Sequence, residues 1–161
     1  MRTRYEFVLI LLACICLAWG QRTAAEPLAP RSALDALTSE LVAGRIQRVD
    51  IYFMPYEWAT RIDVRPEMLE AQADKRFTME ISTAAPEGLV RAIERIRLHE
   101  TREQADLRWG MVFWDCSGNR AHTIYLNSRY IFGTGRRGYI DGTLVGFNAS
   151  LIHWLESNYL K

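Results

Sequence analysis

Cys116 and His122 are the residues of this chain whose types and spacing best match a chemical site. A hairpin turn is expected between them, so their side chains would lie close to each other on neighbouring strands. Nucleophilic catalysis by cysteine needs an imidazole that activates the thiolate and a third group that orients the imidazole. Asp115 and Asp141 are available for that third role. The pair is therefore the candidate site of a small hydrolase, and the alternative is a turn cysteine and a strand histidine without chemistry.

Metal and cofactor sites are not expected from the sequence. The three histidines, His99, His122 and His153, fall on different expected elements, and the chain has no HxxxH, HxH or CxxC spacing. Catalytic zinc takes three protein ligands on rigid elements, which this spacing does not provide. Carboxylates for glycoside hydrolysis are present, but their pairing is spatial and the sequence singles out none of them. We therefore expect no metal and no cofactor.

Two short segments hold the residues that we expect to contact a partner. Tyr56 and Trp58 follow a proline after a strand, and aromatic side chains near arginines are typical of binding surfaces, although packing over an edge of the core is the alternative. Residues 133–138 (GTGRRG) resemble an anion-binding loop, but they lead into a strand and not into a helix N-terminus. We interpret them as a flexible connection that exposes Arg136 and Arg137 to an acidic partner.

The N-terminal residues have the pattern of a secretory signal peptide. Two arginines precede an apolar run over residues 7–18, and small residues follow up to Gly20. A basic start, a short apolar core and a small-residue exit define such a signal, and the run is shorter than the about 20 residues that a membrane span needs. We expect cleavage after Gly20 or as late as Ala25. The segment LLAC, which ends at Cys14, resembles a lipobox, so a lipid anchor at Cys14 is an alternative.

Charge and cysteine content argue against two classes of exported domain, those that bind nucleic acid and those stabilised by internal disulfides. The chain has 20 basic and 19 acidic residues; without residues 1–20, which hold two arginines and one glutamate, 18 of each remain. This neutral balance argues against nucleic-acid binding. Of the three cysteines only Cys116 lies beyond residue 20, so the domain must be stabilised by burial and not by an internal disulfide. Arginine dominates the basic residues, which together with the signal pattern indicates a bacterial protein that is periplasmic or secreted.

Hydrophobic periodicity predicts a single α+β domain over residues 32–161, after the signal over 1–20 and a flexible leader over 21–31. Strands joined by tight turns favour a mostly antiparallel sheet of about five to six strands with three main helices packed on it. Ser32 and Asn148 are the expected caps of the first and last helices, and Asp141-Gly142 is a hairpin signal. Helices are expected over 32–42, over 66–71, from 86 and from 148, and strands over 45–53, 61–64, 76–82, 108–115, 120–126, 139–140 and 143–145.

These features favour an exported bacterial envelope protein that binds another protein and catalyses no reaction. An immunity or inhibitor-type protein fits the size, the export signal and the lack of a catalytic motif. Two alternatives remain open: a small periplasmic hydrolase that uses Cys116 and His122, and a lipid-anchored envelope component. After cleavage of the signal we expect no membrane span.

Overall fold

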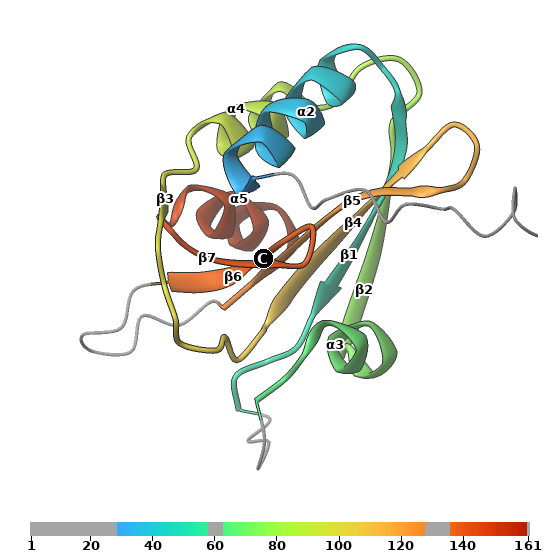
Figure 1. Ribbon diagram of the computed structural model, residues 1–161. Helices are drawn as coiled ribbons and strands as arrows, with labels where there is room; N and C mark the ends of the chain where they lie inside the picture. The colour runs from blue at the N-terminus through green and yellow to red at the C-terminus, as the bar shows by residue number, and fades with distance from the viewer. Residues whose placement is uncertain (1–28, 58–62, 128–135, 161) are drawn as a thin grey trace, which may run out of the picture.

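Antiparallel strands form one sheet in the order β2-β1-β4-β5-β6-β7-β3, and helices pack on both of its sides (Figure 1). The computed structural model describes residues 29–57, 63–127 and 136–160. Among these residues the helices are α2 (Pro30–Val42), α3 (Pro66–Gln72), α4 (Glu87–Glu94) and α5 (Ser150–Tyr159). The strands are β1 (Ile46–Phe53), β2 (Lys75–Glu80), β3 (Leu98–His99), β4 (Trp109–Asp115), β5 (Arg120–Leu126), β6 (Arg136–Ile140) and β7 (Thr143–Phe147).

This architecture confirms the α+β class and the antiparallel sheet. The described part of the sheet has seven strands where five to six were expected. The additional strand is β3, which pairs with β7 through Leu98 and His99 alone, too few residues for an alternating pattern to show. The expected strand over 61–64 is not found at Asp63 and Val64, and its first half lies outside the described residues, as do the predicted signal peptide and Cys14.

Helices α2, α4 and α5 lie together on one side of the sheet and enclose the main core (Figure 1). Leu34, Leu37 and Leu41 recur at helical spacing along α2 and are buried in this core. Strand β4 lies between β1 and β5, and residues 109–113 of it are buried, as expected for a strand with apolar residues on both faces. The part of the chain that the structure describes contains no helix with the length and apolar content of a membrane span.

Among the described residues, helices cover the opposite side of the sheet only in part. Helix α3 lies there, near one end of β1 and β2 (Figure 1), and brings Leu69 into a second, smaller apolar cluster. Val49 and Ile51 of β1 belong to the main core, so the alternating residues Arg48 and Asp50 lie on this second side. The second cluster consists of Met54, Val64, Leu69, Ala105, Leu107 and Tyr125.

The first helix begins earlier than expected. Pro30 starts α2 with Ala29 at the N-cap, so Ser32 is not the cap. A proline suits this position because its missing N–H would have no partner within the helix. At the other end Gly44, with a φ of 67°, follows the last turn, since glycine adopts the left-handed conformation that ends many helices.

The last helix also lacks its expected cap. Ala149 occupies the N-cap of α5, one residue after the predicted Asn148. The Asn148 side chain instead donates to the carbonyl of Arg95 at 2.8 Å and accepts the N–H of Arg97 at 3.1 Å. Asn148 therefore binds the β7–α5 connection to the residues that follow α4. These contacts join segments far apart in the sequence, so the residues around Asn148 do not predict them.

Candidate functional site

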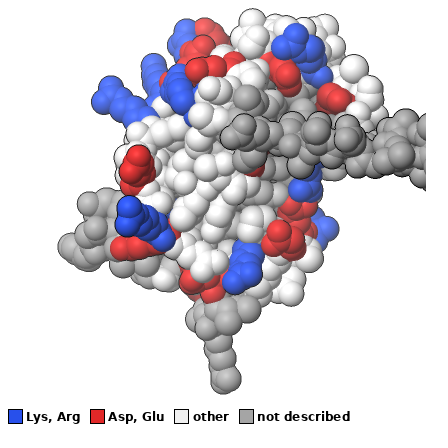
Figure 2. All heavy atoms as spheres, viewed as in Figure 1, with Lys and Arg blue, Asp and Glu red and all other residues white. Residues whose placement is uncertain are grey.

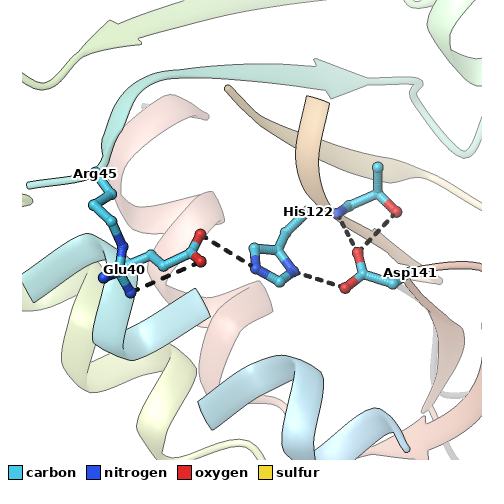
Figure 3. Close-up of polar contacts among 5 residues, drawn as sticks. Glu40, Arg45, His122 and Asp141 are labelled. Atoms are coloured by element: carbon cyan, nitrogen blue, oxygen red, sulfur yellow. Dashed lines mark hydrogen bonds and ion pairs between the residues drawn. The ribbon is translucent and has the colours of Figure 1, made fainter. Parts of the chain in front are cut away.

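His122 lies in β5 opposite Phe113 of β4 and points toward the helix-covered side of the sheet. Asp141 occupies the turn between β6 and β7, and its Oδ2 lies 2.7 Å from Nδ1 of His122 (Figure 3). Oδ1 of the same carboxylate accepts the backbone N–H of Thr123 at 2.7 Å. These two contacts fix the carboxylate against β5, so the hairpin turn orients the imidazole ring.

Glu40 of α2 faces the other nitrogen of the same ring. Its Oε2 lies 3.5 Å from Nε2 of His122, and its Oε1 lies 3.8 Å from a guanidinium nitrogen of Arg45. The pKa of His122 is raised above its usual value, chiefly by the hydrogen bond that its ring donates to Asp141; the negative charges of Asp141 and Glu40 add to the rise, and burial opposes it. Glu40, Arg45, His122 and Asp141 form what we call the histidine cluster (Figure 3).

Cys116 lies near this cluster, in the turn between β4 and β5. It is exposed, and it lines a cavity of about 450 Å³ together with His122, Glu40 and Arg45. Among the described residues, no hydrogen bond joins the thiol to His122. An imidazole that activates a thiol must place a nitrogen within hydrogen-bond reach of the sulfur. Here both ring nitrogens face carboxylates. The geometry therefore favours a structural role, in which the charged ring links α2 to the β6–β7 turn, over activation of the Cys116 thiol.

Two carboxylates, Asp115 and Asp141, were predicted as candidates to orient His122. Asp141 contacts the ring, and Asp115 does not. Asp115 accepts the backbone N–H groups of Ser117 and Asn119 at 2.8 and 2.9 Å and so stabilises the β4–β5 turn. The hydrogen bond from the Asn119 backbone is the main reason why the pKa of Asp115 is lowered. Glu40 was missed, because only the packing of α2 against β5 brings it to the ring.

The predicted aromatic binding residues are only partly described. Trp58 lies outside the described residues. Tyr56 is 38% exposed, and the guanidinium of Arg108 lies 5.0 Å from its ring centroid. Arg108 is itself buried and pairs with Asp106 at 2.6 Å. Tyr56 therefore packs over the buried guanidinium of Arg108, which is consistent with the packing alternative, and its contact with a partner stays a prediction.

Arg136 and Arg137, which were predicted to be exposed in a loop, lie in a strand. Arg136 and Arg137 begin strand β6 and are partly buried, while residues 133–135 lie outside the described chain. The Arg137 side chain is only 12% exposed; it pairs with Glu103 at 2.5 Å and donates to the carbonyl of Gln104 at 3.1 Å. The expectation of an exposed Arg137 is wrong, because Glu103 and Gln104 in the connection before β4 contact its guanidinium group.

A surface that the sequence did not single out lies on the second side of the sheet. The guanidinium carbons of Arg48 and Arg120 lie 4.8 and 5.7 Å from the ring centroid of Trp114. The indole N–H donates to Asp50 at 2.7 Å. Trp114 follows the core residue Phe113 in β4, so it faces the side of the sheet that α3 covers only in part, and it is partly exposed there. We call Arg48, Trp114 and Arg120 the arginine–tryptophan patch.

A cavity of about 760 Å³ lies beside this patch, between α3 and strands β5 and β6. Glu70 occupies its wall, pairs with Arg120 at 2.6 Å and accepts a hydrogen bond from the Tyr125 hydroxyl. Burial is the main cause of the raised pKa of Tyr125, and the hydrogen bond to Glu70 adds to it. The cavity is lined by Arg65, Pro66, Glu67, Glu70, Ala71, Gln104, Arg120, Thr123, Tyr125, Tyr139 and Gly142.

Charge on the visible face of the molecule is mixed in sign. Figure 2 shows basic and acidic side chains near one another around the margin, with a broad area between them that carries no charged side chain. Within the described ranges, no three His, Cys, Asp or Glu side chains are grouped so that they could hold a metal ion. Comparison of the chain with protein-family models, with curated protein sequences and with solved structures gave no match.

Proposed function

We propose that this chain is an exported bacterial domain that binds an acidic surface of another protein through the arginine–tryptophan patch and catalyses no reaction. The observation that carries the proposal is the position of Trp114, which lies between two guanidinium groups on a sheet face that α3 covers only in part. Tryptophan and arginine are the residue types that most often contribute a large share of binding energy at protein interfaces.

The exposed fractions of the side chains indicate the charge of the partner. Arg48 and Arg120 are 42% and 43% exposed, whereas the carboxylates that pair with them, Asp50 and Glu70, are 19% and 23% exposed. The surface therefore presents guanidinium N–H donors outward and keeps the matching carboxylates closer to the sheet. Carboxylates on a partner would complement these donors in charge and in geometry.

The patch is also held in place before any partner arrives. Asp50 accepts the indole N–H of Trp114 and lies 3.4 Å from Nε of Arg48, and Glu70 holds Arg120. Side chains that are already ordered lose less conformational entropy on binding. An inhibitor or immunity-type protein, which works by tight and lasting occupancy, gains from such an arrangement.

The hydrolase alternative has one observation in its favour, which is the cavity that Cys116 shares with His122. The contacts of both ring nitrogens with carboxylates count against it. Only the hydrolase needs a thiol that His122 activates, so an assay of thiol reactivity separates the two proposals.

The binding proposal is tested by co-purification from the cell envelope of the source bacterium with the tagged full chain. The variants are Arg48→Glu and Trp114→Ala, and the matched control is Arg91→Glu, which changes an exposed arginine on α4, across the sheet from the patch. We expect the chain and the control to retain the same partner and both patch variants to lose it. Retention should fall with added salt, because screening weakens exposed charge pairs.

Equal retention by the patch variants and the control would overturn the proposal, as would the absence of any partner that survives washing. Circular dichroism of each variant shows whether it is folded, so loss of binding is not confused with loss of structure. A partner without an acidic surface would also contradict it.

A further inference from the structure

The cavity beside α3 has a polar lining that is balanced in charge. Two arginines, Arg65 and Arg120, and two glutamates, Glu67 and Glu70, contribute to its wall. Its volume of about 760 Å³ lies within the range of small-molecule sites in proteins. Neither the sequence motifs nor the proposed binding of a protein partner accounts for this cavity.

Several polar groups of the lining have capacity for further hydrogen bonds. In the described part of the chain, the side chains of Arg65, Glu67 and Tyr139 form no hydrogen bond or ion pair with another residue. Arg120 uses one guanidinium nitrogen to contact Glu70 and retains other N–H donors. The cavity thus offers donors and acceptors at neighbouring positions, and the ring of Tyr139 adds an apolar surface.

The pairing of Glu70 distinguishes between classes of ligand. Both of its oxygens are already in use, one by Arg120 and one by the hydroxyl of Tyr125, a residue that is 3% exposed. A charged ligand group that pairs with Glu70 or Arg120 would have to break this network, and separating a partly buried pair is costly. The other two charged residues of the lining, Arg65 and Glu67, are exposed and opposite in sign, so together they offer no net charge to an ion. A hydroxyl group can instead donate and accept at once, and so adds to the network without breaking it.

The geometry points to a neutral saccharide as the ligand of this cavity, held by hydrogen bonds to Arg65, Glu67 and the Glu70–Arg120 pair and by contact with Tyr139. The site differs from the arginine–tryptophan patch, although Arg120 belongs to both. A sugar bound here would contact Arg120 from the cavity side and leave Trp114 open to the protein partner. The two proposals can therefore fail separately.

The test is a titration of the full chain, followed by NMR, with two neutral oligosaccharides, the trimer of N-acetylglucosamine and maltotriose. Glycylglycine serves as the zwitterionic probe and citrate as the anionic probe. We expect saturable binding of at least one oligosaccharide and none of the charged probes. Because each hydrogen bond to a charged group contributes strongly to affinity, Glu67→Ala and Glu70→Gln should each weaken binding by about tenfold.

The matched control is Glu87→Gln, which removes an exposed carboxylate from α4, on the other side of the sheet, and should leave the titration unchanged. The proposal is overturned if neither oligosaccharide shows saturable binding. It is also overturned if Glu67→Ala weakens the binding of a charged probe as much as it weakens sugar binding, or if sugar binding is unchanged in both Glu67→Ala and Glu70→Gln. The titration contains no protein partner, and Glu67→Ala changes no residue that contacts the arginine–tryptophan patch, so the result for this variant does not depend on the protein-binding proposal.

Discussion

The carboxylate of Asp141 and the imidazole of His122 join a hairpin turn to a neighbouring strand at 2.7 Å. Asp141 has a φ of 46° and Gly142 a φ of 80°, the pair of left-handed residues that a tight two-residue hairpin requires. The residue that makes the turn thus also supplies the charge that orients the ring. On the other side Glu40 extends the contact to α2, so the cluster links a helix, a strand and a turn.

The first prediction concerns the charge of His122. We expect an NMR titration of the ring to give a pKa above the usual value of about 6.5, because Asp141 and Glu40 both stabilise the imidazolium. Asp141→Asn should lower the pKa markedly, since it removes the nearer carboxylate. Glu40→Gln should lower it less, because this contact is longer. A midpoint at or below 6.5 in the unaltered chain would contradict this account of the cluster.

The second prediction concerns the pH dependence of the free energy of unfolding, which is linked to the pKa shift of His122. The folded-state pKa of His122 is raised, so its contribution is fully present below the unfolded value of about 6.5 and is lost as pH rises through the folded value. Urea denaturation across this window should therefore show stability falling with pH. The difference in the free energy of unfolding between the unaltered chain and His122→Gln measures the contribution of the His122 charge. This difference should become smaller as pH rises. A difference that grows with pH would have the wrong sign.

A third prediction tests the close pairing of β5 and β6. A Cβ atom at Gly138 would overlap the backbone carbonyl of Tyr125, which cannot rotate away as a side chain would. We expect Gly138→Ala to lower the free energy of unfolding by about 1–3 kcal/mol, the usual cost of overpacking. The control is Gly118→Asn in an open turn with a φ of 75°, because asparagine tolerates this conformation. Denaturant unfolding of both variants measures the contrast.

Local signals account for much of the fold. The leucines of α2 and the Asp141-Gly142 turn are each specified by residues close in the chain, and both are found as predicted. The contact of Asp141 with His122 also follows from the sequence, once the hairpin and β5 are placed side by side.

The residues that the sequence could not place depend on contacts across long stretches of chain. Arg137 lies where alternation alone leaves it exposed, yet Glu103 of a distant connection covers it. Glu40 has the ordinary position of a helix-surface acid, and only the packing of α2 on the sheet makes it a partner of His122. Trp114 lies on the side of the sheet that α3 covers only in part, and no local pattern shows how far a distant helix will cover a strand.

The fourth prediction concerns helix α3, which forms one wall of the polar cavity. Leu69 is fully buried and anchors this helix to the second apolar cluster. We expect Leu69→Ala to destabilise the chain by about 2–5 kcal/mol, as for other leucines truncated in a core. Glu67→Ala, on the exposed side of the same helix, should change stability by less than about 0.5 kcal/mol. Equal effects of the two variants would show that α3 does not pack as described.

The last prediction separates binding from thiol catalysis. Cys116 is exposed and forms no hydrogen bond with His122 among the described residues, so its reactivity should be that of an ordinary surface thiol. We expect a thiol reagent to label it in the folded chain, with peptide mapping to assign the label. His122→Gln should leave the labelling rate within about twofold of the unaltered rate, because the ring does not activate the sulfur.

The hydrolase alternative requires the opposite result. A catalytic pair would label fastest where the thiolate and imidazolium coexist, and His122→Gln would slow labelling by about tenfold or more in that pH range. The control is Asp115→Asn, which disturbs the turn that holds Cys116 but leaves His122 in place. If His122→Gln slows labelling strongly while Asp115→Asn does not, the imidazole acts on the thiol, and the proposal of a purely binding function fails.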